Sequence, residues 1–174
     1  MRIALTGGIA CGKSLTAKYL GEFGVETLDA DDIVHEILPD PAERRRIAAE
    51  VFGNEKKRKE LEAKIHPLVA ERLEAWAAEK TGRLKVEIIP LLFETHWEGK
   101  YDIICTLRSE RTKQIERMIE TRGYMLEEAE RRLGAQMAVS EKAARSQYVI
   151  DNDGSAEELR EKVAKFVEYL KERS

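Results

Sequence analysis

Residues 3–14 read Ile3-Ala4-Leu5-Thr6-Gly7-Gly8-Ile9-Ala10-Cys11-Gly12-Lys13-Ser14, a short apolar run that leads into a glycine-rich stretch. Gly7 to Ser14 match G-x-x-x-x-G-K-[ST], the pattern of a phosphate-binding loop, and the next residues predict a helix. A strand, a glycine-rich turn and a helix in that order are the context that this pattern requires. Glycines let successive N–H groups face one anion, and the helix N-terminus adds partial positive charge. The stretch predicts a nucleoside triphosphate site.

Each residue of this loop has an expected task. We expect Lys13 to hold the β- and γ-phosphates of ATP, and the Ser14 hydroxyl to bind Mg²⁺. The other predicted ATP contacts are Gly8, Ile9, Ala10, Cys11, Gly12 and Leu15. Cys11 is either a redox-sensitive thiol or a residue at a variable position without a task of its own, and we favour the second interpretation. A chance match is disfavoured because the pattern and both flanks agree.

The composition describes a globular chain and excludes several classes of partner. The 174 residues are 36% charged and 43% hydrophobic, and the net charge of −3 argues against a nucleic-acid partner. Apolar runs long enough to cross a bilayer are absent, and Met1-Arg2 leads straight into the first strand, so we expect neither a membrane span nor a signal peptide. The spacing of Cys11 and Cys105 suggests no metal site and no disulfide framework. A cytoplasmic monomer or weak homo-oligomer is expected.

Apolar runs alternate with helical stretches along the chain. The predicted strands are 2–5, 25–28, 85–89, 103–107 and 148–150. The predicted helices are 13–23, 31–38, 42–51, 57–80, 110–121, 126–138 and 156–173. This alternation predicts an α/β fold with a five-stranded parallel sheet flanked by helices and joined by right-handed crossovers. Ligands of such sheets bind at the carboxyl ends of the strands.

Two insertions interrupt the predicted nucleotide-binding core, which comprises residues 1–32, 83–110 and 139–174. Residues 33–82 hold more helix than a simple crossover needs and predict a separate helical domain. Residues 111–138 are rich in arginine, as expected of a lid that closes over the triphosphate. The arginines are Arg111, Arg117, Arg122, Arg131 and Arg132. The alternative is an exposed helix whose arginines pair with glutamates at helical spacing. That alternative is favoured for any single arginine, whereas the lid is favoured for the segment, because small kinases must exclude water.

Acidic residues follow the second predicted strand. In Asp29-Ala30-Asp31, one carboxylate is placed to accept the proton of an attacking hydroxyl and the other to orient Mg²⁺ through water. The alternative is that Asp29 or Asp31 caps the helix that begins near Asp32. Both interpretations stay open for Asp29, and catalysis is favoured for Asp31. A guanine-specific N-K-x-D motif is absent from the sequence, which disfavours a GTPase.

Two further places hold polar residues whose tasks stay open. His66-Pro67 is either a substrate contact or a helix break, because the residue before a proline avoids the α conformation. Glu94, at the end of Pro90-Leu91-Leu92-Phe93-Glu94, either supports the ligand site or begins a helix.

Several stretches together resemble the dephospho-CoA kinases, in the order found in that family. They are residues 4–9 with the phosphate loop, Leu28-Asp29-Ala30-Asp31, residues 61–67, residues 89–94, Gln114-Ile115-Glu116-Arg117, Arg132 with Gln136, and Val149-Ile150-Asp151-Asn152. The resemblance implies a P-loop kinase fold and ATP-dependent phosphorylation of the ribose 3′-hydroxyl of dephospho-CoA. It also implies that residues 33–82 bind this acceptor and that residues 111–138 are the lid.

The resemblance assigns tasks to individual residues. Asp31 is the expected base, and the other implied catalytic residues are Lys13, Asp29 and Arg132. Arg117 and Asn152 are expected at ATP, with Asn152 beside the adenine. The acceptor contacts that it implies are Asp31, Arg44, His66, Pro90, Leu91 and Glu94.

The chain also departs from the family pattern. Residues 40–44 lead almost directly into Val51-Phe52, so the acceptor domain is shorter than usual. The lid arginine after Arg117 is displaced by one residue to Arg122, and Ser146-Gln147 replaces the usual Ala-Asp. Two alternatives stay open: another small-metabolite or nucleotide kinase, and a nucleotide-binding protein without catalysis.

Overall fold

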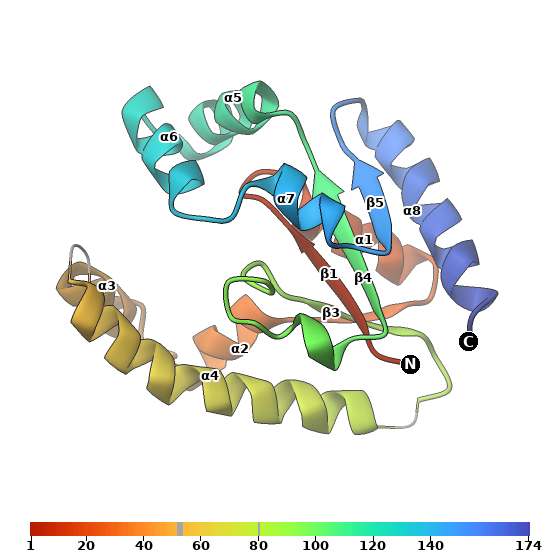
Figure 1. The fold of residues 1–174 in the computed structure, drawn as a ribbon, viewed down its shortest axis with the longest axis horizontal. Coiled ribbons are helices and arrows are strands. Elements are labelled where there is room, and N and C mark those ends of the chain that lie inside the picture. The colour runs from red at the N-terminus through yellow and green to blue at the C-terminus, as the bar shows by residue number, and fades with distance from the viewer. Residues whose placement is uncertain (52–53, 80) are drawn as a thin grey trace. The chain divides into compact units, whose positions relative to one another are not determined.

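The fold is that of a computed structural model, which describes residues 1–51, 54–79 and 81–174 (Figure 1). The Phe52 of the shortened segment and the predicted helix end at residue 80 therefore lie outside the described residues. The chain divides into two compact units, one formed by Met1–Thr27 with Gly82–Ser174 and the other by Leu28–Thr81.

A five-stranded sheet carries the phosphate loop. Its strands, in the order β2-β3-β1-β4-β5, are β2 (Glu26–Asp29), β3 (Lys85–Ile88), β1 (Ile3–Gly7), β4 (Ile103–Arg108) and β5 (Tyr148–Asp151). β1 pairs in parallel with β3 and β4, and β4 pairs in parallel with β5. The predicted fold class is confirmed. β1 runs two residues further than predicted, because Thr6 and Gly7 continue the register with β4.

Apolar helix faces bury the sheet of the first unit. α1 (Lys13–Glu22) and α8 (Ala156–Lys171) contact each other, and α8 begins where Ser155 Oγ accepts a hydrogen bond from the N–H of Glu158. α7 (Val139–Ala144) contacts β4 and β1 and lies in front of them in Figure 1. The core side chains include Leu5, Leu20, Cys105, Leu107, Val163 and Phe166.

The arginine-rich segment forms two helices, α5 (Arg111–Arg122) and α6 (Leu126–Gly134), which contact each other. The prediction that the second helix continues to residue 138 is wrong. α6 ends at Gly134, and after a non-helical stretch the short helix α7, which was not predicted, begins at Val139. Six residues are too few to show a helical period, so α7 leaves no clear signal in the sequence.

The second unit is helical, with α2 (Ala30–Ile37), α3 (Pro41–Val51) and α4 (Glu55–Ala78), and both shorter helices contact α4. α4 begins after Asn54, whose side chain accepts a hydrogen bond from the N–H of Lys57. Pro67 lies inside α4, so the helix break at His66-Pro67 is wrong. Proline removes one backbone donor, and the remaining turns of this 24-residue helix tolerate the loss.

Candidate active site

The phosphate loop joins the end of β1 at Gly7 to the start of α1 at Lys13. Gly12 immediately precedes the helix with a φ of 95°, a left-handed conformation that favours glycine. A Cβ atom at Gly12 would lie 2.4 Å from Asn152 Nδ2, and one at Gly8 would lie 2.4 Å from Gln114 Nε2. Because these positions are glycines, the amide side chains of Asn152 and Gln114 can pack directly against the loop backbone.

Three side chains hold three consecutive carbonyl groups of the loop. The carbonyls of residues 9–11 accept hydrogen bonds, in order, from Gln114 Nε2 at 2.7 Å, Arg117 NH1 at 3.2 Å and Asn152 Nδ2 at 2.9 Å. In a trans peptide the N–H points opposite to the C=O. Fixing the carbonyls on one side therefore turns the amide groups of this stretch toward the inside of the loop, where the N–H of Cys11 donates to the Gly8 carbonyl at 3.3 Å and an anion can bind. We call Gln114, Arg117 and Asn152 the carbonyl clamp.

The carbonyl clamp is itself tied together. Arg117 donates to Ser109 Oγ at 3.1 Å and to the carbonyl of Asn152 at 2.8 Å. Ser109 Oγ donates to the same carbonyl at 2.8 Å. Gln114, Asn152 and Ser109 are all buried. Arg117 and Asn152, both predicted at ATP, thus shape the loop from behind through their side chains.

Apolar contacts join the loop to the arginine-rich helices. Ile9 and Ala10 pack against a buried cluster of α5 and α6 formed by Met118, Ala129 and Leu133. Because these two loop positions match no fixed residue of the phosphate-loop pattern, the motif alone gives no hint of this contact. Any movement of α5 and α6 is therefore passed to the loop by packing as well as by hydrogen bonds.

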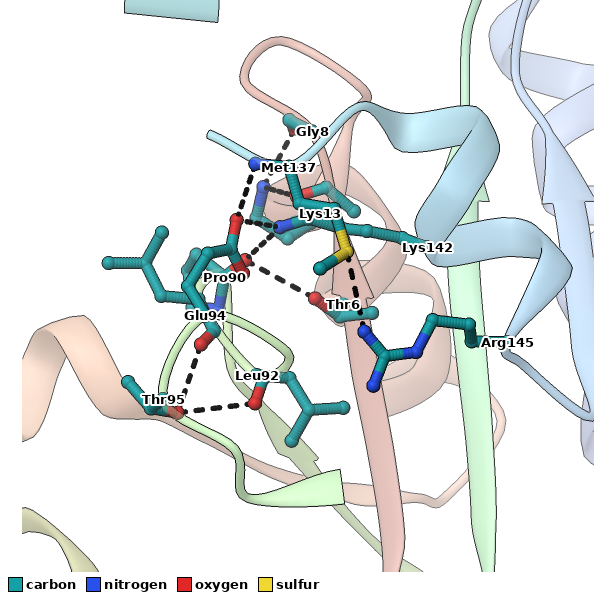
Figure 2. A network of polar contacts seen from close by, with 12 residues as sticks. Thr6, Gly8, Lys13, Pro90, Leu92, Glu94, Thr95, Met137, Lys142 and Arg145 are labelled. Carbon is teal, nitrogen blue, oxygen red and sulfur yellow. Dashed lines mark hydrogen bonds and ion pairs between the residues drawn. The ribbon is translucent and has the colours of Figure 1, made fainter. Parts of the chain in front are cut away.

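Lys13 lies at the mouth of the loop (Figure 2). Its Nζ donates to the carbonyls of Gly7 at 3.0 Å and Gly8 at 2.9 Å. Ser14 follows in the first turn of α1 and is exposed. The structure supports the second interpretation of Cys11: burial raises the pKa of its thiol, so the group stays protonated and unreactive at neutral pH.

Two of the lid arginines, Arg131 and Arg132, make the helical pairing with glutamate that the sequence offered as an alternative. Arg132 Nε and NH2 lie 3.0 and 2.9 Å from Glu128 Oε1, and its guanidinium lies 4.5 Å from the centre of the Tyr124 ring. Arg131 lies 3.9 Å from the same carboxylate. Both carboxylate contacts lie within α6, and Tyr124 lies two residues before this helix. The catalytic task of Arg132 stays a prediction.

The segment after β3 carries three predicted acceptor contacts. The Pro90 carbonyl accepts hydrogen bonds from Thr6 Oγ1 at 3.3 Å and Lys142 Nζ at 2.8 Å (Figure 2). Leu91 is exposed. Glu94 Oε1 accepts the N–H of Met137 at 3.0 Å. Of the two interpretations of Glu94, the helix start is not observed.

In the second unit, Asp29 is the N-cap of α2, and its Oδ1 accepts the N–H of Asp31 at 2.9 Å. The capping interpretation of Asp29 is thus confirmed, and the Asp31 side chain is exposed. Arg44 NH1 donates to the carbonyls of Leu38 and Pro39, just beyond the end of α2. His66 is half-buried within α4. The catalytic and acceptor tasks of these residues stay predictions.

A cavity of about 600 Å³ opens beside the phosphate loop within the first unit. Its lining includes Gly8 of the loop, Arg111 and Gln114 of α5, and Leu133 and Met137 around the end of α6. Small-molecule sites usually measure about 300–1,000 Å³, so the space suits a nucleotide-sized ligand. Among the predicted ATP contacts, Gly8 lines this cavity.

Two residues that shape this region, Gln114 and Lys142, have no task that was predicted from the sequence. Gln114 lies three residues before Arg117 on the same face of α5, and that spacing was a usable signal. Lys142 left no signal, because its short helix was not predicted and its neighbours Ser140 and Glu141 resemble a solvated surface.

Comparison with known proteins identifies relatives over nearly the whole chain. The family model described as dephospho-CoA kinase matches residues 1–43 and 40–158. A dephospho-CoA kinase from Shouchella clausii is 34% identical over 90% of this chain and 92% of its own length. The crystal structure of TT1252 from Thermus thermophilus superposes with a TM-score of 0.83 at 31% identity, covering 96% of this chain and 95% of that one. A shikimate kinase from Acinetobacter baumannii shares the fold alone, with a TM-score of 0.68 at 16% identity, covering 99% of this chain and 94% of that one.

Proposed function

The chain belongs to the dephospho-CoA kinase family, and from that premise we propose that it transfers the γ-phosphoryl group of ATP to the ribose 3′-hydroxyl of dephospho-CoA, giving coenzyme A and ADP. This is the final step of coenzyme A synthesis. The observation that carries the proposal is a phosphate loop whose carbonyls are held by three side chains, in a chain that matches the family over residues 1–158.

ATP is the donor that this family uses, and the loop supplies its binding groups. When ATP binds, Lys13 Nζ exchanges its two carbonyl partners for the β- and γ-phosphate oxygens. The loop amides and the N-terminus of α1 stabilise the remaining negative charge. Because the carbonyl clamp already holds the loop in its binding conformation, the loop need not reorganise in each turnover. Such preorganisation lowers the barrier of phosphoryl transfer.

Mg²⁺ fits the residues at the loop. The described residues gather no cluster of three His, Cys, Asp or Glu side chains that would form a protein-built metal site. Mg²⁺ bound with nucleotides needs only one or two protein ligands besides phosphate oxygens and water. The exposed hydroxyl of Ser14 in the first turn of α1 suits that requirement. When bound, Mg²⁺ would neutralise charge on the phosphates.

Asp31 is the proposed general base. Its carboxylate is exposed at the start of α2, and its backbone N–H is held by Asp29. A carboxylate in hydrogen-bond reach of the acceptor 3′-hydroxyl takes its proton as the oxygen attacks phosphorus. Arg132 is proposed to exchange Glu128 for the transferring phosphoryl group, which carries spread negative charge.

The remaining assignments are also proposals. Arg44, His66, Pro90, Leu91 and Glu94 are proposed to contact dephospho-CoA. A cytoplasmic location and a monomeric or weakly associated state are proposed on the sequence alone. Within the described part of the chain, no helix combines the length and apolar character that a membrane crossing requires.

A panel of acceptors and one variant test the proposal. With ATP and Mg²⁺, dephospho-CoA should be turned over with a higher kcat/KM than adenosine, AMP or shikimate. Asp31→Asn should reduce transfer to dephospho-CoA by about 10²–10⁴-fold, while its ATP affinity, measured by calorimetry, stays that of the wild type. Faster turnover of another acceptor rejects the assignment of the substrate, and full activity of Asp31→Asn rejects the assignment of the base.

A further inference from the structure

Lys142 of α7 has a fully buried side chain, with a relative exposure of 0%. Its Nζ lies 2.8 Å from the Pro90 carbonyl and 2.8 Å from Glu94 Oε1 (Figure 2). Lysine is almost never fully buried unless it is paired. Both partners lie on the segment after β3, so this ammonium group fixes that segment against α7.

The Glu94 carboxylate depends on this cation. Oε1 accepts the N–H of Met137 in addition to its contact with Lys142. Oε2 is buried, and the described residues offer it no hydrogen-bond partner. Removing one partner of an ion pair that is largely buried leaves the other charge uncompensated, which is strongly destabilising. Without Lys142, Glu94 would keep one hydrogen bond and lose its compensating charge.

Met137 lies on the chain that returns from α6 to α7, and it lines the cavity beside the phosphate loop. Lys142 therefore reaches this return segment through Glu94, and it reaches β1 through the Pro90 carbonyl, which also accepts Thr6 Oγ1. Arg145, three residues after Lys142, contacts the segment after β3 and the segment between α6 and α7. Its guanidinium lies 4.5 Å from the Phe93 ring centre, and its NH1 lies 3.8 Å from Met137 Sδ. α7 thus holds three parts of the first unit together.

We propose that Lys142 is a positioning residue for phosphoryl transfer, which acts by fixing Pro90, Glu94 and Met137 in place; this proposal rests on the proposed function. With its side chain fully buried, Lys142 acts through these three residues rather than on a substrate. Its loss shifts the segment after β3, where three acceptor contacts are proposed, while the phosphate loop stays held by the carbonyl clamp. A misplacement of about 1 Å caused by a remote change lowers a rate by up to about 10²-fold.

A double-mutant cycle tests this proposal. The variants are Lys142→Met, Glu94→Gln and the combination of both, with Lys165→Met, an exposed lysine of α8, as the matched control. Lys142→Met should lower kcat/KM for dephospho-CoA about tenfold or more, chiefly through KM, while the dissociation constant of ATP stays unchanged. The combined variant should be no worse than the poorer single variant, because the two side chains act as one unit. Lys165→Met should match the wild type.

Three results would overturn the proposal. One is an unchanged acceptor KM in a folded Lys142→Met protein. Another is a Lys142→Met variant in which only kcat falls, and falls in proportion to the fraction of the protein that is folded. That result indicates a purely structural role for Lys142. The third is a combined variant whose loss of kcat/KM equals the product of the losses in the two single variants. That result means that Glu94 acts independently of Lys142. If Lys142→Met does not fold, the combined variant, which removes the uncompensated carboxylate, completes the comparison with Glu94→Gln.

Hydrogen exchange separates this proposal from the proposed function. The Met137 amide should exchange at least about tenfold faster in Lys142→Met than in the wild type, because its acceptor Glu94 is no longer fixed. This measurement needs no substrate. Unchanged protection of Met137 contradicts the positioning role even if the kinase assignment holds. Conversely, if the wild-type protein does not phosphorylate dephospho-CoA, the proposed function is wrong, but the contact between Lys142 and Glu94 is not called into question.

Discussion

Asn152→Asp tests the carbonyl clamp with a change of a single functional group. In the wild type, Asn152 Nδ2 donates to the Cys11 carbonyl at 2.9 Å from a side chain that is 6% exposed. Aspartate has nearly the same shape, but its ionised carboxylate has no proton to donate. Two oxygens then face each other in a buried place, so the Cys11 carbonyl loses its partner and the loop is pushed away from its binding conformation.

The size of the effect follows from this geometry. A buried carbonyl that loses its donor costs about 1–3 kcal/mol, so we expect the free energy of unfolding to fall by about 2 kcal/mol near pH 7.5. If about 1.4 kcal/mol of this energy is taken from the ATP-binding conformation of the loop, ATP affinity falls about tenfold. The burial and the facing carbonyl raise the pKa of the introduced carboxyl above its unfolded value of about 3.9.

The stability loss of Asn152→Asp should depend on pH in one direction. A group whose pKa is raised on folding loses its contribution as the pH rises through the folded pKa and regains it as the pH falls. The protonated carboxyl also donates to the Cys11 carbonyl again. The stability gap between variant and wild type, measured by urea unfolding, should therefore narrow from pH 7.5 to pH 5.5. Asn54→Asp is the matched control, since aspartate caps a helix as well as asparagine does. If the variant and the wild type have the same free energy of unfolding at pH 7.5, or if the difference between them grows on acidification, then Asn152 does not stabilise the loop in the proposed way.

Three further predictions concern the loop, the base and the buried thiols. Asp31→Asn should reduce transfer by about 10²–10⁴-fold at unchanged ATP affinity, and calorimetry together with a coupled assay checks both values. Lys13→Met should weaken ATP binding by about tenfold or more without loss of folding, because it removes a charged partner of the phosphates, and wild-type affinity would contradict this. Burial raises the pKa of the Cys11 and Cys105 thiols, so iodoacetamide should label them at pH 7.5 only after denaturation. By the same shift, their contribution to stability is fully present below about pH 8.5 and is lost as the pH rises above it.

The sequence predicted the parts of the fold that depend on local pattern. The phosphate loop is encoded in consecutive residues, and the alternation of strands with helices determines the class of sheet. The end of β1 was predicted too early because Thr6 and Gly7 continue its ladder, which depends on pairing with β4. The helix break at Pro67 was wrong because the contacts of α4 with α2 and α3 outweigh the loss of one backbone hydrogen bond.

The contacts that shape the site come from residues far apart in the sequence. Gln114 lies 105 residues from Ile9, and Asn152 lies 141 residues from Cys11, so no local pattern relates either pair. Lys142 reads as a surface lysine, because its burial depends on Pro90 and Glu94, some fifty residues earlier. By contrast, the sequence offered both interpretations of Asp29, and the structure shows the cap.

Identification of the phosphorylated product shows whether this chain transfers phosphate to the ribose 3′-hydroxyl of dephospho-CoA. The protein is incubated with dephospho-CoA, Mg²⁺ and ATP labelled in its γ-phosphate, and the product is analysed by mass spectrometry and by release of the label with a 3′-nucleotidase. A dephospho-CoA kinase gives coenzyme A as the single labelled product, and all of the label is released from the ribose 3′ position. Label at another position, or no transfer to dephospho-CoA while another acceptor is phosphorylated, would contradict the proposed function.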